Sequence, residues 1–528
     1  MNCPGNRRFL LVLLLLGLAL SAHAFEPLPL RDSAVAERYA QWAKDTIERG
    51  QWAQALAGLE RAADFADVSS DISYLLALAR ANQNKSRRAV LEALSKALYI
   101  NRWNLFNSEA ARLLKAETLI NIRAYHEALA ELSRVRRSPR EAVLTLRALA
   151  AFRPWEFLTH MKHTLDLYPR ETGPVRVFFG FLNAEHRAGR IPGRDGLELL
   201  ELVIRRLPAL LLHDRELAWM AAPFMWDAAE ARRLVLAYRA IHDPVPESLP
   251  IALRLGVIDE KTALEELFAG NALDRNLLDE VRELLRDEEA ISLFRRNLSA
   301  FTGVITEDAD WDGIPETVAK YVEGMLVLYT YDATQDGVPS LTVYFEAGEP
   351  RRALTLLPPE LDGSSRQMAS IHWERYPAIL EVELEGVRYI PQPFAFHHSP
   401  FLFNNLWDSG LLFPERDPLT PPLTRRILVF NSQRVERPSL EFRGGIEVVT
   451  LSQGIPVRAR EYVGDLMVAE TEFLLGRPQF QRVDLTLSGR MDTLRRFSSA
   501  YRPMELEDLW DYTRDIEYTV SGVEWLND

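Results

Sequence analysis

The sequence predicts an α + β protein of two parts, a helical array over residues 33–300 followed by a mostly antiparallel β domain over residues 301–528. Up to about residue 300 the chain is rich in Ala, Leu, Glu and Arg, and apolar residues recur at intervals of three and four, which is the period of an amphipathic helix. From Phe301 onward, Val, Tyr, Phe and Thr alternate with polar residues, as they do in strands. With 528 residues, 47% of them hydrophobic, the chain can bury more than one core.

The first 24 residues are typical of a secretory signal peptide. Arg7 and Arg8 precede an apolar run over residues 9–20, and residues 21–24 (Ser-Ala-His-Ala) form a small-x-small cleavage site. We expect cleavage after Ala24 and an exported mature chain, either periplasmic, associated with the cell envelope or secreted. The alternative is an uncleaved anchor, although the apolar run is short for a membrane span.

Composition narrows the classes of partner. Cys3 is the sole cysteine and precedes the cleavage site, so a mature chain would have no disulfide, thiolate metal site or cysteine nucleophile. The formal net charge is −13, and loss of the two arginines of the signal lowers it by two, to −15. This acidic balance disfavours nucleic acid and anionic lipid as partners. No segment after the signal is apolar for long enough to span a membrane.

After a proline-spaced leader, residues 25–32, two helical segments share one pattern. Residues 50–62 and 125–135 each carry an aromatic residue, Trp52 or Tyr125, three positions before a small residue, Ala55 or Ala128. Both segments resemble the second helix of a tetratricopeptide repeat. In that family the small residue lies where the two helices of a repeat touch. The resemblance implies helical hairpins stacked into an α-solenoid.

A weaker unit lies between these two segments, with Val90 in place of the small alanine. The intervals from Ala55 to Val90 and from Val90 to Ala128 are 35 and 38 residues, against the family period of about 34. The clearest repeats therefore cover residues 36–135, and an ordinary helical bundle is the alternative. Prolines and glycines divide residues 139–300 into further segments of helical length. Whether these segments continue the solenoid stays open.

The family resemblance also implies a concave groove lined by the first helix of each repeat. No Lys, Asn and Arg cluster of the kind that grips a terminal carboxylate is present, so we expect another sort of protein or peptide partner in the envelope. The alternative is that some of the groove positions only cover the solenoid. The positions placed in the groove are Lys44, Ile47, Leu75, Asn82, Leu113, Glu117 and Ile120.

A short acidic loop begins at Asp308 and predicts a metal site. Carboxylates at alternate positions of a tight loop converge their oxygens on one point, and Gly313 permits the chain to reverse, as calcium sites require. The loop resembles the first half of an EF-hand and, more closely, the calcium loops of FG-GAP-type β repeats. We therefore expect a structural Ca²⁺ ion. Its ligands would be Asp308, Asp310, Asp312 and Glu316.

The loop pattern returns 24 residues later, with fewer acids. Thr334 and Ser340 stand where the first loop has carboxylates, so a weaker second site is expected. A third, fainter copy lies at residues 484–492, and a solvated acidic turn is the alternative at each loop. The weaker ligand set is Asp332, Thr334, Asp336 and Ser340.

The β half reads as repeated units of loop, strand, tight glycine turn and returning strand, which predicts an antiparallel meander of hairpin repeats. Residues 391–422 interrupt this order and are rich in proline and aromatic residues. We expect a long insertion packed on the sheet, and an exposed binding loop is the alternative.

The sequence contains no nucleophile elbow, zinc-protease helix, phosphate loop or dinucleotide fingerprint. We therefore expect a non-enzymatic scaffold or adaptor. The alternative is that the β domain binds or acts on cell-wall or surface polysaccharide, because paired carboxylates can catalyse such chemistry. Its acids would be Asp362, Glu374, Glu381 and Glu383. The oligomeric state stays open.

Overall fold

A computed structural model describes residues 30–62, 69–83, 86–187, 189–190, 193–241, 245–309, 313–358, 367–392, 396–498 and 519–525. The expected signal peptide lies outside these residues, as does most of the expected leader. The chain divides into two compact units, Met1–Met225 and Trp226–Asp528. The first unit is helical, and the second joins helices to an antiparallel sheet. The two-part α + β fold predicted from the sequence is confirmed.

The first unit is built from short helices whose ends follow local sequence signals. Pro139 and Pro154 occupy the first turns of two of them, where a missing N–H costs no hydrogen bond. Asn107 and Ser138 accept backbone N–H groups as N-caps. The helices are α2 (Leu30–Glu48), α3 (Trp52–Arg61), α4 (Ser70–Asn82), α5 (Arg87–Ile100), α6 (Ser108–Asn121), α7 (Tyr125–Leu132), α8 (Pro139–Phe152), α9 (Pro154–Leu167), α10 (Gly173–Arg187), α11 (Arg194–Leu210), α12 (Leu217–Ala221) and the 3₁₀ turn η3 (Ala222–Phe224).

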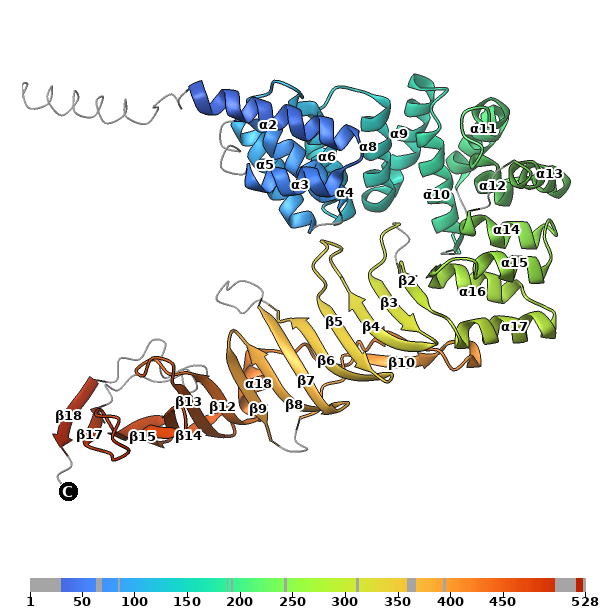
Figure 1. Ribbon diagram of the computed structural model, residues 1–528. Coiled ribbons are helices and arrows are strands. Elements are labelled where there is room, and N and C mark those ends of the chain that lie inside the picture. Colours follow the sequence, from blue (N-terminus) through green and yellow to red (C-terminus); the bar gives the residue numbers. More distant parts are fainter. Residues whose placement is uncertain are drawn as a thin grey trace, which may run out of the picture. The chain divides into compact units, whose positions relative to one another are not determined.

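Successive helices of this unit pair as hairpins, α2 with α3, α4 with α5, α6 with α7 and α8 with α9 (Figure 1). Each hairpin also packs on the next, since α3 contacts α4, α5 contacts α6, and α7 contacts α8. First helices meet as well, α2 with α4, α6 with α8 and α8 with α10. The hairpins therefore stack in sequence order, and small apolar clusters form between neighbours.

The second unit begins with helices and continues as strands. Its helices are α13 (Ala228–Arg239), η4 (Pro246–Ser248), α14 (Leu249–Arg254), α15 (Glu260–Leu267), α16 (Arg275–Leu284), α17 (Glu288–Ser299), η5 (Leu406–Asp408) and α18 (Arg425–Asn431). Its strands are β1 (Ala272–Asp274), β2 (Gly303–Glu307), β3 (Thr317–Val322), β4 (Met325–Tyr331), β5 (Leu341–Glu346), β6 (Glu349–Leu356), β7 (Met368–Arg375), β8 (Ala378–Leu384), β9 (Val387–Pro391), β10 (Phe401–Asn405), β11 (Leu412–Arg416), β12 (Ser432–Pro438), β13 (Ile446–Ser452), β14 (Ile455–Val463), β15 (Leu466–Leu474), β16 (Arg477–Val483), β17 (Thr493–Ser498) and β18 (Thr519–Trp525).

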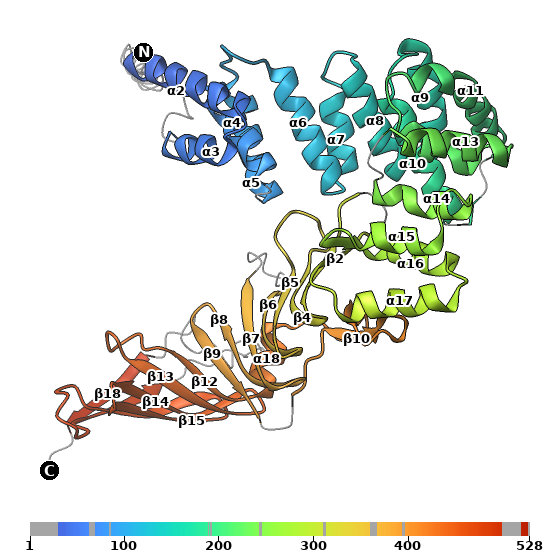
Figure 2. The same cartoon turned by 45° about the vertical axis from the view of Figure 1, so that its right-hand side comes forward.

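Among the described residues, sixteen strands form one sheet, and they follow one another in sequence order apart from the separate pair β10–β11 (Figures 1 and 2). Strand β1 runs parallel to β2, and all other neighbours are antiparallel. Five two-residue turns have positive φ at both positions, the conformation that matches the twist of a hairpin. They are Glu323-Gly324, Ala347-Gly348, Glu385-Gly386, Gln453-Gly454 and Leu475-Gly476.

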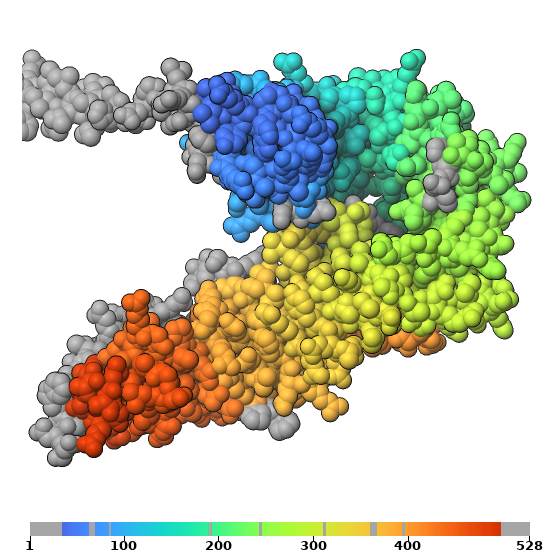
Figure 3. Space-filling view, viewed as in Figure 1, coloured from blue at the N-terminus to red at the C-terminus, as the bar shows by residue number. Residues whose placement is uncertain are grey.

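One hydrophobic core joins helices α14–α17 to strands β2–β14. Phe294 and Leu298 of α17 are fully buried in it, together with Tyr321 and Tyr329 of the sheet. In the space-filling view, residues 249–301 and the neighbouring strands form one continuous surface (Figure 3). The boundary between compact units, after Met225, thus differs from the change in composition near residue 300. Composition reports where secondary structure changes, whereas packing decides which helices share a core with the sheet.

The insertion after β9 packs on the sheet. The hairpin β10–β11 buries Phe401 and Phe413 completely, and the ring of Phe401 lies 5.8 Å from that of Tyr329. Arg275 of α16 pairs with Glu415 of β11 at 2.5 Å and lies over the ring of Phe413. These contacts hold the hairpin between the sheet and α16.

Candidate functional site

The contacts inside the helical hairpins depend on small side chains. Ala55 and Ala128, the small positions of the repeat pattern, are fully buried, and so is Val90 in the weaker unit. In the first hairpin, Trp42 lies against Gly58, where an added Cβ would come within 2.3 Å of the indole ring. Close helix contacts of this kind fix the angle within each hairpin. Among the first helices, α2 contacts α4 and α6 contacts α8.

Polar bridges join the first helices α6 and α8. Arg140 donates to Glu117 at 2.9 Å, and Arg147 donates to Asn121 at 3.2 Å. Glu117 and Arg140 are partly exposed, so the pair contributes about 1 kcal/mol or less to stability. Because the pair is accessible and weak, a charged group of a partner can compete for either residue.

The structure separates the expected groove residues into two kinds. Leu75 and Ile120 are buried in the cores between helices, so the prediction that they line a groove is wrong. On a helix, a residue that faces the next hairpin can be adjacent in sequence to one that faces solvent. The repeat pattern does not distinguish these two kinds of position.

The remaining groove residues keep some exposure. Ile47 and Leu113 are half-buried beside the cores, and Asn82 is exposed. Lys44 lies 3.8 Å from Glu48. Together with Glu117, the groove residues that keep some exposure are more polar as a group than the predicted set.

Two buried acids of this unit were not predicted. The carboxylate of Asp71 accepts the backbone N–H groups of Asn104, Leu105 and Phe106, which fixes the loop between α5 and α6. Burial alone would raise the pKa of the Glu131 carboxyl, but hydrogen bonds and charge from Lys115 and Arg112 hold it below its ordinary value. The partners of Asp71 lie 33 to 35 residues away, so no local pattern reveals them.

In the second unit, the three acidic loops lie at the same end of the strands. They follow β2, β4 and β16, which are separated by even numbers of places in the antiparallel sheet and therefore run in the same direction. Their first aspartate has the same role in each. Its carboxylate accepts the N–H of the glycine five residues later, at 2.7 Å for Asp308, 2.8 Å for Asp332 and 2.6 Å for Asp484. This hydrogen bond closes each loop. It explains why the same spacing of aspartate and glycine recurs in all three loops.

The ninth residue of the loop adds a second shared contact. Glu316 accepts the N–H of Ala309 at 2.9 Å, and Asp492 accepts the N–H of Leu485 at 3.2 Å. In the middle loop Ser340 instead donates to the carbonyl of Tyr331. Glu316 is buried, and Gln335 of the next loop donates to its carboxylate at 3.1 Å. The first and second loops are therefore joined side by side.

The expected calcium ligands are only partly described. Asp310 and Asp312 lie outside the described residues, and the described parts of the chain contain no group of three or more His, Cys, Asp or Glu side chains arranged to hold a metal ion. Asp308 and Glu316 supply carboxylate oxygens, the donor type that Ca²⁺ prefers. The cation site in the first loop thus stays a prediction.

In the weaker loop, hydrogen bonds within the protein already engage the acids. Asp336 accepts the N–H of Val338 at 2.8 Å, and Thr334 lies 3.4 Å from the Asp332 carboxylate. These contacts hold the loop closed from within the chain. The second site also stays a prediction.

The acids of the polysaccharide alternative are not gathered together. Asp362 lies outside the described residues, and Glu374 and Glu383 are exposed. Glu381 accepts from Arg388 at 2.5 Å, and Arg388 also pairs with Glu436. An ion-paired carboxylate on a solvent-facing strand is an ordinary feature of a sheet surface.

Within the described residues, no helix combines the length and the apolar character needed to cross a membrane.

No protein-family model matches the chain. Over an aligned length of 603 residues it is 21% identical to an uncharacterized protein of Treponema pallidum (strain Nichols), and this match covers 90% of the chain and 74% of that protein.

Three solved structures are similar at low TM-score. MamA (41-end) from Desulfovibrio magneticus RS-1 matches with a TM-score of 0.28 and 21% identity, over 34% of this chain and 97% of that one. PilF of Pseudomonas aeruginosa matches at 0.27 and 15%, over 50% and 98%. A tetratricopeptide repeat protein from Parabacteroides merdae ATCC 43184 matches at 0.34 and 11%, over 49% and 96%. At these identities and TM-scores, the comparisons assign the chain to no family.

Proposed function

We propose that this protein is an exported, non-enzymatic scaffold that binds a protein or peptide of the cell envelope through the first helices of its stacked hairpins. The observation that carries the proposal is the series α2 to α9, in which successive helices pair as hairpins and each hairpin packs on the next. Stacked hairpins of this kind present an extended surface that suits a peptide or a protein segment.

Charge at Glu117 provides the test. Glu117 lies on the first helix α6, and Glu127 is an exposed glutamate on the second helix α7 of the same hairpin. The mature chain, residues 25–528, is immobilised and exposed to envelope extract. We expect Glu117→Arg to lower retention of a specific protein at least fivefold, and the matched control Glu127→Arg to leave retention unchanged. Equal retention by both variants, or no specifically retained protein with the wild type, would contradict the proposal.

Calcium is the proposed structural cofactor of the first acidic loop, with Asp308, Asp310, Asp312 and Glu316 as ligands. Support comes from the closed shape of the loop and the burial of Asp308 and Glu316. Binding to the folded state alone would stabilise it by about 3 kcal/mol at a hundredfold excess over Kd.

Thermal melts in calcium and in chelator test this cofactor. We expect a lower midpoint in chelator for the wild type, and no response to calcium in Asp310→Ala. The control is Asp465→Ala, an exposed aspartate in a turn at the same end of the strands; it should respond to calcium as the wild type does. Identical wild-type melts in the two media would remove the cation from the proposal.

Export is proposed from the N-terminal pattern alone. Intact-mass analysis of protein recovered from the envelope fraction tests it, with Phe25 expected as the first residue. Recovery of an unprocessed chain from the cytoplasm would contradict it.

A further inference from the structure

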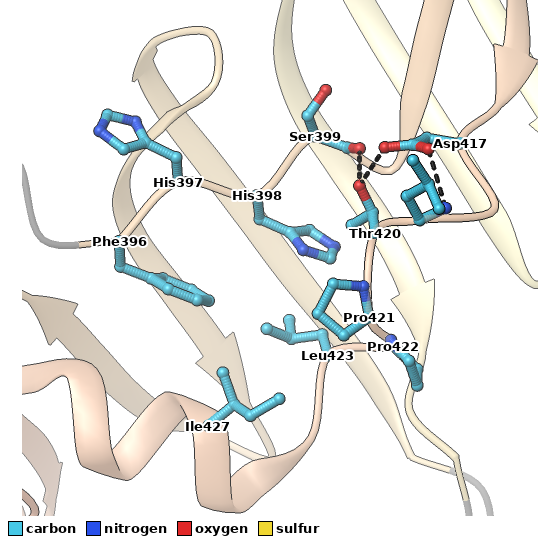
Figure 4. A pocket seen from close by; sticks show the side chains of 11 residues that line it. Phe396, His397, His398, Ser399, Asp417, Thr420, Pro421, Pro422, Leu423 and Ile427 are labelled. Atoms are coloured by element: carbon cyan, nitrogen blue, oxygen red, sulfur yellow. Dashed lines mark hydrogen bonds between the residues drawn. The ribbon is translucent and has the colours of Figure 1, made fainter.

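A cavity of about 220 Å³ lies in the second unit, beside the β10–β11 hairpin. Its walls come from residues 396–399, which precede β10, and from residues 417–423, which follow β11, and Ile427 of α18 completes them (Figure 4). The two segments are tied together, because Thr420 donates to the carbonyl of Ser399 at 2.5 Å and Asp417 N–H donates to the carbonyl of Pro400 at 3.1 Å. These hydrogen bonds fix the two wall segments of the cavity relative to each other at the base of the hairpin.

Apolar side chains form one part of the wall. Phe396, Leu423 and Ile427 face one another across it, and Pro421 and Pro422 form the adjoining side (Figure 4). Phe396 and Ile427 are half-buried and Leu423 is buried, so their positions are fixed by packing. A flat or compact apolar group would make close contact with this wall on several sides.

One polar side chain in the cavity makes no hydrogen bond to any described residue. His398 is only 6% exposed, its ring stacks with that of Phe396 at 6.4 Å between centroids, and its backbone N–H donates to the carbonyl of Pro377. In Figure 4 the ring of His398 points toward Thr420, Pro421 and Leu423, whereas the ring of His397 points away. The ring nitrogens of His398 are not sealed from the cavity, so they can hydrogen-bond a molecule that enters it.

The charge state of the cavity favours a neutral ligand. Burial lowers the pKa of His398 to about 4, so its imidazole is uncharged at neutral pH and offers one donor and one acceptor. The wall also contains Asp417, whose carboxylate accepts from Leu419 N–H and from the Thr420 hydroxyl, and His397, whose ring points away (Figure 4). A ligand anion would meet the charge of Asp417, and a hydroxyl can serve either side of the imidazole.

The volume suits a ligand with a single ring. An apolar protein cavity of about 150 Å³ holds benzene, whereas sites for drug-sized molecules occupy roughly 300–1,000 Å³. A volume of about 220 Å³ lies between these values. A six-membered ring with one or two small substituents fits this range.

We propose that the cavity binds a small uncharged molecule that carries one ring and a hydroxyl group. The ring packs against Phe396, Leu423 and Ile427, and the hydroxyl exchanges a hydrogen bond with the imidazole of His398. This site is independent of the helical surface and of the acidic loops.

Phenol, benzene and benzylamine serve as probes of the mature full-length chain at neutral pH. Binding is followed by the methyl resonance of Ile427 and by the ring resonances of His398. We expect phenol to bind about tenfold more tightly than benzene, the contribution of one ordinary hydrogen bond. His398→Leu should abolish this preference while benzene still binds, and the matched control His397→Leu should retain it.

The outcomes separate the proposal from its alternatives. Ile427→Trp, which fills the cavity, should abolish the binding of both phenol and benzene. Equal affinity for phenol and benzene in the wild type would overturn the role of His398. Preference for benzylamine would assign the cavity to cations through Asp417, and no binding of any probe would show that it holds only water. Each of the last three results contradicts the proposal.

Discussion

Gly324 holds the turn between β3 and β4 against the end of α17. Its φ is +75°, and an added Cβ would lie 2.0 Å from the carbonyl oxygen of Ser299. Its N–H donates to the carbonyl of Phe301, and the neighbouring N–H of Glu323 donates to Thr302. The turn therefore connects the sheet to the helical part of the same unit.

Gly324→Ala is expected to destabilise the second unit by about 3 kcal/mol. Positive φ alone costs an alanine about 1–2 kcal/mol, and the clash with Ser299 adds to this. Gly348→Ala is the control, since its φ is +77° but its Cβ would meet nothing within 4 Å. Denaturant unfolding should show a clearly larger loss for Gly324→Ala than for Gly348→Ala. Equal losses would show that the contact with Ser299 is relieved at little cost.

His398 gives the second unit a pH dependence of stability. Burial lowers its pKa from 6.5 to about 4 in the folded state, so the unfolded chain takes up a proton first as pH falls. Stability attributable to His398 is fully present above pH 6.5 and is lost progressively toward pH 4, by up to about 3 kcal/mol. The difference in unfolding free energy between wild type and His398→Leu, measured from pH 7.5 to 4.5, should shift by most of this amount. A constant difference would exclude it.

At the scale of elements, the hairpins of the first unit depend on close helix contacts. Ala128 of α7 is fully buried against α6, whereas Ala130 on the same helix is exposed. Ala128→Leu should destabilise the hairpin by about 1–3 kcal/mol, because three extra carbons must displace packed neighbours. Ala130→Leu should change stability by less than about 0.5 kcal/mol. Chemical denaturation followed by helical circular dichroism compares the two, and equal effects would contradict close contact at Ala128.

The acidic loops show how one sequence pattern carries two explanations. The aspartate and glycine five residues apart were predicted as part of a cation loop, and their spacing is also what closes the loop by a hydrogen bond from Gly313, Gly337 or Gly489. The same carboxylate can accept an amide and ligate a cation, so the pattern alone does not separate a structural turn from a metal site.

At the scale of the whole molecule, the second unit needs its helices. Six buried side chains of α15–α17 enter the core that the sheet also forms, and burial of each is worth about 1.5–3 kcal/mol. Their sum, roughly 9–18 kcal/mol, is as large as the whole stability of an ordinary domain, about 5–15 kcal/mol. The six residues are Leu264, Leu267, Leu278, Val281, Phe294 and Leu298.

A fragment of residues 226–528 is therefore expected to fold cooperatively, and a fragment of residues 301–528 is expected to lose cooperative unfolding or to aggregate. Thermal unfolding by near-ultraviolet circular dichroism compares the two fragments. Equal cooperativity would show that the sheet does not require helices α14–α17, and that the change in composition near residue 300 is also the boundary of folding.

The sequence by itself determined the order of helix and strand, the small contact positions Ala55 and Ala128, and the closing spacing of the acidic loops, because all of these follow from local periodicity and local hydrogen bonds. Tertiary structure alone decided that α13–α17 belong with the sheet, that Leu75 and Ile120 are core residues, and that His398 lies in a cavity. These features depend on contacts between segments far apart in the chain, and no local pattern records which segments pack together.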